Sequence, residues 1–340
     1  MKSATLKQIA NELGLSVTTV SKALNNYTDV SAKTKQRVIN LAAKLNYTPN
    51  SFALGLRKQE SKTIGVIIPD NVHYFFSRII KGVLEVAEQN NYLVIVMQSN
   101  EDYELEKKQI DLLISKGVDG ILISLSNKTH KFDHLNKIIN NDIPLILFDK
   151  IAKTVNCSKV IIDDRKAAYE AVTHLIKKGF KRIAHFRGDL NPQNSIDRFL
   201  GYKKALQDNN IDFDPSLVYL CNNNSDFEDG FKTAQKLLSD HGKNVDALFT
   251  VNDLLAIGAL KYFNDNNINV PKRIALIGFS NWFMSTVVSP SLSTVEQHGF
   301  EMGKQSATLL FHEIKCKQKG VKFEHQKIVM QTELVIRDSC

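Results

Sequence analysis

The stretch TLKQIANELGLSVTTVSKALN, residues 5–25, decides how the first part of the chain folds. Apolar residues repeat at helical spacing over residues 6–13, and Gly14 follows, where a residue that readily adopts positive φ can end a helix. Ser16 is then placed to cap a second helix over residues 17–24. Two short helices joined by a tight turn predict a helix-turn-helix.

The outer face of the second helix carries side chains suited to a DNA groove. Val20, Ala23 and Leu24 are expected to point inward. The outward side chains are short or polar: Val17, Thr18, Ser21, Lys22 and Asn25. Hydroxyl groups bind phosphate, a methyl group meets thymine, and a lysine reaches O6 and N7 of guanine. For this stretch alone, an ordinary helical hairpin with a solvated face is the alternative.

Charge is distributed unevenly along the 340 residues, whose net charge is +8. Residues 1–60 hold nine lysines and arginines against three acidic residues, which gives +6 and leaves +2 for the other 280 residues. A small basic head on a nearly neutral body is typical of a protein that binds a polyanion. A membrane surface would attract the same charge, but the head has no lipid-anchor motif and no strongly hydrophobic face.

The cysteines and the apolar segments favour a protein of the reducing cytoplasm. The four cysteines are scattered without a CxxC pair, which argues against a zinc site and a disulfide framework. The histidines show no HExxH or other ligand spacing, so no metal is expected. The N-terminus has no apolar signal core, and no 18-residue apolar run occurs.

The next two segments extend the head. Ser31 can cap a third helix in which apolar residues recur to Leu45, and Pro49 follows its end. Residues 50–57 are too short to hold a helix alone in water, so one interpretation is a flexible linker. The other is a hinge helix that folds only against a partner copy and DNA, with Leu56 wedged into the minor groove.

From Thr63 onward, apolar strands alternate with helices, which is typical of parallel α/β folds. A second set of strands and helices begins near Lys159 and repeats the plan of the first. Two open α/β lobes of this kind place the carboxyl ends of their strands at a shared cleft, where ligands bind. The predicted domains are a headpiece (1–49), a hinge (50–60) and a core (61–340), with a first lobe of about 61–160 and 293–320 and a second lobe of about 161–292 and 321–340.

An enzyme is the competing class of function. The chain contains no GxSxG, GxxxxGK[ST] or GxGxxG motif. Asp163 and Asp164 are adjacent carboxylates, but successive side chains of an extended segment diverge. We therefore expect no enzymatic activity and no cofactor. The alternative is a cytoplasmic small-molecule-binding protein or an α/β enzyme with an incidental basic head.

Several motifs resemble the LacI–GalR family of bacterial transcription regulators along nearly the whole chain. In the head they are TLKQIANELGLSVTTVSKALN and VSAKTKQRVINLAAKLNYTPN; in the body they are IGVIIPD, PLILFD, FTVNDLLAIGAL, VPKRIALIGFSN and PSLSTVEQ. The resemblance implies a helical headpiece, a hinge helix and a core like that of periplasmic sugar-binding proteins. It also implies a homodimer on a pseudo-palindromic operator in double-stranded DNA. The tail shows no leucine heptad, which favours dimers over tetramers.

The resemblance also implies roles for single residues of the head. Val17, Thr18 and Lys22 match positions that read bases, and Leu56 matches a lever in the minor groove. The expected DNA contacts are Thr5, Leu6, Ser16, Val17, Thr18, Thr19, Ser21, Lys22, Asn25, Ser31, Tyr47, Asn50, Ala53, Leu56 and Arg57. The family usually has arginine at the position of Lys22, and lysine lacks the two-pronged donor that arginine offers to guanine.

In the cleft, Asp149, Arg198, Asn252 and Gln297 match positions that commonly touch an effector, and Phe75 or Phe76 matches an aromatic that stacks on it. The expected effector contacts are Asp70, Phe75, Phe76, Asp149, Arg198, Asn252, Asp253, Ser280, Trp282 and Gln297. A sugar or sugar derivative is the expected effector, with a nucleoside or purine as the alternative.

Structural roles compete with these assignments. Asp149 and Arg198 could form an ion pair with each other. Asn252 and Asp253 could cap the following helix, for which Asp253 is well placed, and capping is compatible with effector contact. Trp282 could stack on a sugar or pack between the lobes. Two positions depart from the family pattern: Ser280 stands where aspartate is frequent, and His298 where proline is frequent.

Overall fold

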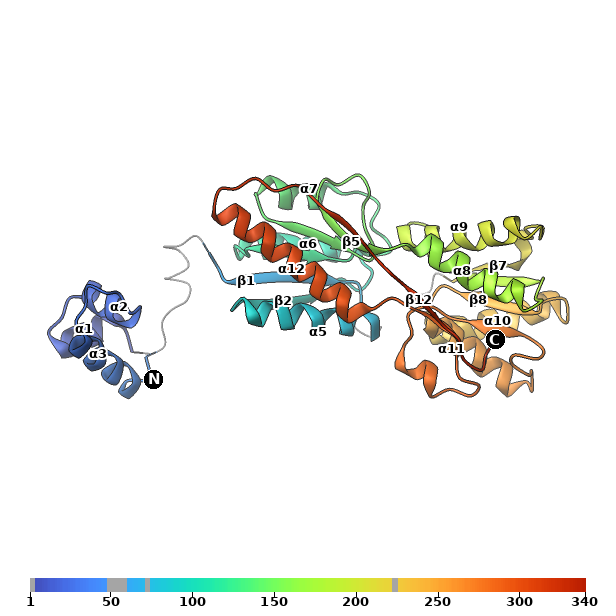
Figure 1. The fold of residues 1–340 in the computed structure, drawn as a ribbon, viewed down its shortest axis with the longest axis horizontal. Helices are drawn as coiled ribbons and strands as arrows, with labels where there is room; N and C mark the ends of the chain where they lie inside the picture. Colours follow the sequence, from blue (N-terminus) through green and yellow to red (C-terminus); the bar gives the residue numbers. More distant parts are fainter. Residues whose placement is uncertain (1–3, 48–59, 71–73, 222–225) are drawn as a thin grey trace. The chain divides into compact units, whose positions relative to one another are not determined.

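The computed structural model describes residues 4–47, 60–70, 74–221 and 226–340. They form two compact units, residues 1–61 and 62–340, which are described separately below (Figure 1). Within the described residues, no helix has both the length and the apolar character needed to span a membrane.

The first unit is a three-helix headpiece made of α1 (Leu6–Leu13), α2 (Val17–Leu24) and α3 (Ala32–Lys44). Each helix begins at a capping hydroxyl, because the side chains of Thr5, Ser16 and Ser31 accept hydrogen bonds from backbone N–H groups three residues later. Gly14 ends α1 with φ of 66°, as predicted. The buried core comprises Ile9, Ala10, Val20, Ala23, Val30, Val38 and Ala42. The predicted helix-turn-helix is confirmed.

The first lobe of the core is a six-stranded parallel sheet in the order β11-β5-β4-β3-β1-β2. Its strands are β1 (Thr63–Ile68), β2 (Leu93–Gln98), β3 (Gly120–Ile123), β4 (Leu145–Phe148), β5 (Ser158–Ile162) and β11 (Lys327–Met330). Its helices are α5 (Tyr74–Gln89), α6 (Tyr103–Ser115), α7 (Asp133–Asn140) and α12 (Gly299–Gln318). Ile64, Val66 and Ile68 of β1 pack toward α5 and α12, whereas Ile67 packs toward α6 and α7.

Two glycines allow α5 and α12 to cross at close range over one face of this sheet (Figure 1). A Cβ atom at Gly82 would lie 2.1 Å from the carbonyl oxygen of Phe300, and one at Gly303 would lie 2.1 Å from that of Ile79. Any larger side chain at either position would push the two helices apart.

The second lobe is a four-stranded parallel sheet in the order β7-β6-β8-β9. Its strands are β6 (Ile183–Arg187), β7 (Val218–Leu220), β8 (Ala247–Thr250) and β9 (Ala275–Ile277). Its helices are α8 (Asp164–Lys177), α9 (Gln193–Asp208), α10 (Phe227–His241) and α11 (Asp253–Asp265). Short 3-10 turns occupy Pro215–Leu217 and Phe283–Thr286. The predicted fold class, a helical headpiece followed by a two-lobed α/β core, is confirmed.

The division of strands between the lobes differs from the prediction at three places. The strand near Lys159 was expected to open the second lobe, but β5 pairs with β4 in the first sheet. Residues 321–340 were expected in the second lobe, but β11 pairs with β5, so Lys327 lies opposite Lys159. Conversely, β10 (Thr294–Glu296) pairs with β12 (Glu333–Val335) and adjoins β9, so it extends the second lobe rather than the first. Hydrophobic periodicity indicates a strand but not its neighbour, which explains these errors.

Candidate functional site

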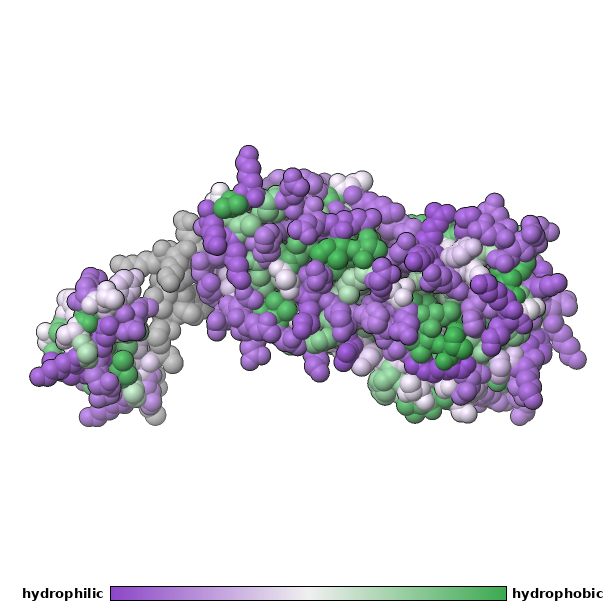
Figure 2. Space-filling model, in the orientation of Figure 1, coloured by the Kyte–Doolittle hydropathy of each residue, from purple (hydrophilic) through white to green (hydrophobic). Residues whose placement is uncertain are grey.

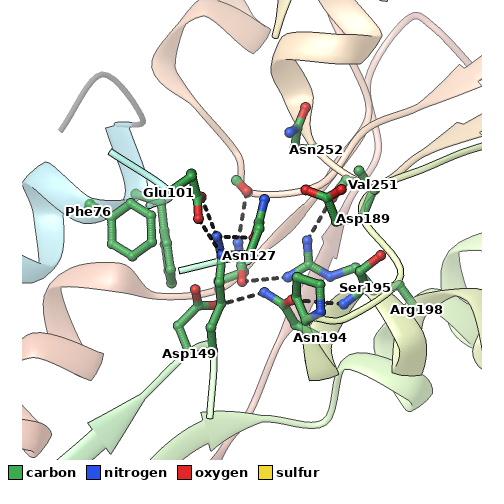
Figure 3. A pocket seen from close by; sticks show the side chains of 16 residues that line it. Phe76, Glu101, Asn127, Asp149, Asp189, Asn194, Ser195, Arg198, Val251 and Asn252 are labelled. Atoms are coloured by element: carbon green, nitrogen blue, oxygen red, sulfur yellow. Dashed lines mark hydrogen bonds and ion pairs between the residues drawn. The ribbon is translucent and has the colours of Figure 1, made fainter. Parts of the chain in front are cut away.

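A cavity of about 100 Å³ lies between the two lobes, where the carboxyl ends of several strands meet (Figure 3). Phe75, Phe76, Asp149, Arg198, Asn252, Ser280 and Gln297 line it, as the sequence predicted. Glu101, Asn127, Lys150, Asp189, Asn194 and Ser195 line it as well and were not predicted. The structure therefore brings most of the predicted residues together, although their roles in binding stay predictions.

Arg198 of α9 is buried and fully engaged by the protein. Its Nε donates to Asp164 Oδ1 at 2.8 Å, one terminal nitrogen donates to the carbonyl oxygen of Val251 at 2.6 Å, and the other donates to Gln297 Oε1 at 3.2 Å. Gln297 in turn donates to Ser280 Oγ at 2.8 Å. The alternative ion pair between Arg198 and Asp149 is therefore wrong, because Asp164 holds this position. Arg198 ties the second lobe to a segment that crosses between the lobes.

Asp149 directly follows β4 and adopts φ of 55°, in the left-handed region. Its carboxylate accepts hydrogen bonds from Asn194 Nδ2 at 3.3 Å and Ser124 Oγ at 3.4 Å. Because Asn194 belongs to α9, the first of these bonds joins the two lobes. Burial raises the pKa of Asp149, although the nearby charges of Lys150 and Arg198 oppose that rise.

A polar network missed by the sequence reasoning lies beside Asp149. Lys150 Nζ is 2.5 Å from Glu101 Oε1 and 2.5 Å from Asn127 Oδ1. The backbone N–H of Asn127 donates to Glu101 Oε2 at 2.5 Å. Burial raises the pKa of Asp189, although the side-chain amide of Asn127 opposes that rise. These residues follow β2, β3, β4 and β6, so their place after parallel strands was a signal that could have found them.

Two aromatic rings and one hydroxyl complete the wall. The ring centroids of Phe75 and Phe76, at the start of α5, are 5.5 Å apart. A Cβ atom at Gly299 would lie 3.0 Å from the ring of Phe75, so this ring packs on the start of α12. The hydroxyl of Ser195 is buried and has no hydrogen-bond partner among the described residues. A buried donor without a partner favours a missing ligand or water.

Of the two residues expected at the start of α11, Asn252 is the cap and also lines the cavity between the lobes. Asn252 caps α11, because its Oδ1 accepts a hydrogen bond from the N–H of Leu255 at 2.9 Å. Both oxygens of the buried Asp253 are occupied, by the N–H of Trp282 at 2.7 Å and by Thr294 Oγ1 at 2.6 Å, among others. Burial raises the pKa of Asp253. The prediction that Asp253 caps α11 is therefore wrong. Asp253 lines a smaller neighbouring cavity rather than the one between the lobes, and its contact with an effector stays a prediction.

Two further predicted effector contacts, Trp282 and Asp70, lie outside the cavity between the lobes. Trp282 lines a smaller neighbouring cavity and packs edge-on against Phe283, with ring centroids 5.6 Å apart. Asp70 is not among the residues that line the cavity between the lobes; Gln98 Nε2 lies 3.5 Å from its carboxylate. His298 adopts φ of 53°, which proline cannot adopt, and this accounts for the departure from the family pattern.

The headpiece presents the predicted DNA-facing side chains on α2. Val17, Thr18 and Asn25 are exposed, and Lys22 forms an ion pair with Asp29. The hydrogen bond from Lys22 holds the pKa of Asp29 below its usual value. The hydroxyls of Thr5, Ser16 and Ser31 act as helix caps, Ser16 Oγ also lies 2.8 Å from Thr19 Oγ1, and the backbone carbonyl of Ser21 accepts from Asn25 Nδ2 at 2.8 Å. Leu6 and Tyr47 pack on the core of the headpiece. Asn50, Ala53, Leu56 and Arg57 lie outside the described residues.

Two family models match the chain. Residues 61–333 match the model described as periplasmic binding proteins and the sugar-binding domain of the LacI family. Residues 5–50 match the model of bacterial regulatory proteins of the lacI family. The two matches divide the chain at the same place as its two compact units.

Comparison with individual proteins gives the same family. The chain is 31% identical to the HTH-type transcriptional regulator RegA of Clostridium saccharobutylicum, over 98% of each chain. The lac repressor dimer bound to operator and the anti-inducer ONPF has a similar fold, with a TM-score of 0.86, 23% identity and 99% of each chain covered. A LacI family regulator from Enterococcus faecium with bound ribose has a TM-score of 0.71 and 27% identity, over 82% of this chain and 98% of that one.

Proposed function

Because the chain belongs to the LacI family of bacterial regulatory proteins and is a ligand-responsive, DNA-binding transcription regulator, we propose that its effector is a sugar or sugar derivative bound between the core lobes. The single observation that carries this proposal is the cavity itself. Carboxylates, amides and hydroxyls surround it on several sides, and Phe75 and Phe76 add two aromatic rings. Polar groups of this kind bind ring hydroxyls, and aromatic faces stack on the apolar side of a sugar.

The relatives support a sugar as the class of effector. The model matched by residues 61–333 includes the sugar-binding domain of the LacI family, and the Enterococcus faecium regulator was solved with ribose. Effector binding in the cavity changes the angle between the two lobes. Residues 50–60 transmit this change to the headpiece and so alter its affinity for the operator. The protein acts in the cytoplasm as a repressor.

On the DNA side, α2 occupies the major groove. Val17, Thr18 and Lys22 read base edges, while Thr19 and Ser21 lie near phosphates. The family likeness supports this placement, and so does the surplus of positive charge over residues 1–60.

A homodimer on a pseudo-palindromic operator completes the proposal. At the edge of the first sheet, the side chains of Leu93 and Val96 on β2 are 65% and 42% exposed, and Leu84 of the neighbouring α5 is 47% exposed. An apolar sheet edge of this kind is typically covered by a partner. On the face shown in Figure 2, hydrophobic residues gather in separate patches on the otherwise hydrophilic core. A second copy of the chain is the proposed partner.

Fluorescence of Trp282, the single tryptophan, tests the effector proposal directly. The full-length protein is titrated with monosaccharides, oligosaccharides, sugar phosphates and nucleosides, with calorimetry on the same panel. Because Trp282 and Asn252 line one small cavity and Asn252 also lines the larger one, a sugar in the larger cavity is expected to change the emission. Saturable binding by nucleosides alone, or by none of the panel in either assay, would overturn the sugar proposal.

The coupling proposal is tested by Leu56→Ala. An operator is first selected from random duplex DNA with the full-length protein. We expect the variant to bind this operator more weakly and to bind the effector with unchanged affinity, because the leucine acts only on DNA. Equal operator affinity in the variant and the parent protein would exclude a wedge at this position.

A further inference from the structure

The cavity between the lobes contains more negative than positive charge. Three carboxylates line it, from Glu101, Asp149 and Asp189, and two cations, Lys150 and Arg198. The partners of these five groups decide what charge an entering ligand meets. Salt does little to screen charges that are buried in this way.

Both cations are already neutralised within the protein. Lys150 Nζ lies 2.5 Å from Glu101 Oε1, and both side chains are largely buried. Arg198 pairs with Asp164 at 2.8 Å and gives its other nitrogens to Val251 and Gln297. An anionic ligand such as a phosphate ester would find no cation here without breaking one of these pairs.

Asp149 and Asp189, by contrast, form no ion pair within the described part of the chain. Asp149 accepts hydrogen bonds from two neutral groups, and the neutral amide of Asn127 helps to lower the pKa of Asp189. Burial raises the pKa of both carboxyl groups, which means that their ionised forms are short of stabilising partners. A positive charge placed beside either carboxylate would supply that partner.

The cavity also has an open position for a ligand hydroxyl. Ser195 Oγ, at the start of α9, is buried, lines the cavity and has no hydrogen-bond partner among the described residues. Ser195 is 4% exposed, so bulk water does not take that place. This observation is independent of the carboxylates, and it indicates a polar ligand rather than a bare cation.

We infer that the effector is an amino sugar whose ammonium group pairs with Asp189, while its hydroxyls meet Asp149 and Ser195. Asp189 is assigned to the ammonium group because it is the less buried of the two carboxylates. The inference rests on the proposed function of this cavity as a sugar site.

Calorimetry with the full-length protein at pH 7 tests the inference on matched sugars. Glucose, galactose and mannose are each compared with their 2-amino-2-deoxy, N-acetylated and 6-phosphate derivatives. We expect one amino sugar to bind about tenfold more tightly than its neutral parent, because an ammonium–carboxylate hydrogen bond is stronger than a neutral one. Its N-acetylated form, which keeps the nitrogen but loses the charge, is expected to bind no better than the parent. The phosphates are expected not to bind.

The variant Asp189→Asn tests whether Asp189 causes the preference for the amino sugar over the neutral sugar. The variant is expected to lose the advantage of the amino sugar over its neutral parent sugar. Asp70→Asn removes the same charge outside the lining of the cavity, so it is the matched control and should keep the preference. The affinities of the unsubstituted protein for each sugar and its three derivatives need no variant, so the test does not depend on how Asp189→Asn folds.

The outcomes separate the inference from the proposal beneath it. If a neutral sugar or a phosphate binds as tightly as the amino sugar, the inference is overturned and the sugar site stands. If Asp189→Asn keeps the preference, the assignment of the ammonium group is overturned. If no sugar of any charge binds, the proposed function fails, and the inference fails with it.

Discussion

The headpiece and the core each contain an ion pair that involves a predicted contact residue, and the two pairs differ in kind. In the headpiece, Lys22 and Asp29 are 41% and 53% exposed. In the core, Arg198 and Asp164 are only 6% and 9% exposed, and Arg198 makes two further hydrogen bonds. Exposed pairs add little stability and exchange partners easily, whereas a buried pair that loses one member leaves a costly charge. The exposed Lys22 can therefore exchange its partner, as the predicted DNA contact requires, whereas the buried Arg198 stabilises the core.

The largest effect is expected from Arg198→Leu. Removing the guanidinium leaves Asp164 buried without a partner and strips donors from Val251 and Gln297. We expect the core to lose about 3–5 kcal/mol of unfolding free energy, as buried pairs do when one member is removed. Urea unfolding followed by Trp282 fluorescence measures the loss.

Lys204→Leu is the matched control for this comparison. Lys204 pairs with Asp208 on the same helix, α9, but these two side chains are 48% and 34% exposed. We expect a change of less than about 1 kcal/mol. Comparable losses in the two variants would remove the distinction between buried and exposed pairs.

A second buried carboxylate extends the comparison to pH. Glu313 of α12 accepts a hydrogen bond from Ser158, its other oxygen has no partner among the described residues, and burial raises its pKa to about 7. The folded protein therefore binds this proton more tightly than the unfolded chain. Its stabilising contribution is complete below about pH 4.5 and is lost as the pH rises toward 7.

Glu313→Gln removes this ionisation and keeps the shape of the side chain. At pH 8 the variant is expected to be more stable than the parent protein, by on the order of 2 kcal/mol. Near pH 4.5 the difference should vanish. Urea unfolding between pH 4.5 and pH 8 measures how the unfolding free energy of each protein changes with pH. The same pH dependence in the variant and the parent protein would show that Glu313 does not titrate as described.

The two units also differ in how much of them the sequence predicted. The bounds of α1 and α2 agree with the expected 6–13 and 17–24, because caps such as Ser16 and the left-handed Gly14 act over a few residues. In the core the elements were found, but β5 and β11 were assigned to the wrong lobe. β11 pairs with β5 from 168 positions away, Lys327 opposite Lys159, whereas β5 pairs with the preceding strand β4. No local pattern encodes which strand becomes the neighbour.

In the cavity, the sequence likewise predicted which side chains are present but not which partners they bind. The partner of Arg198 is Asp164 rather than Asp149, and Lys150 is held by Glu101 from another strand end. Family likeness named several lining residues but not their hydrogen bonds. These depend on the register of the sheets, so Asp189 and Asn194 became visible only in the structure.

The smallest effect is expected from Asp29→Asn, which breaks the exposed ion pair of the headpiece. Freed from Asp29, Lys22 is available to phosphates, so affinity for non-operator duplex DNA should rise about two- to threefold and fall more steeply with salt. Binding is measured by fluorescence polarisation in four proteins: parent, Asp29→Asn, Lys22→Ala and the double variant. If the carboxylate acts through Lys22, the gain shrinks when Lys22 is absent. An equal gain in both backgrounds would mean that Asp29 repels DNA by its charge alone and does not restrain Lys22.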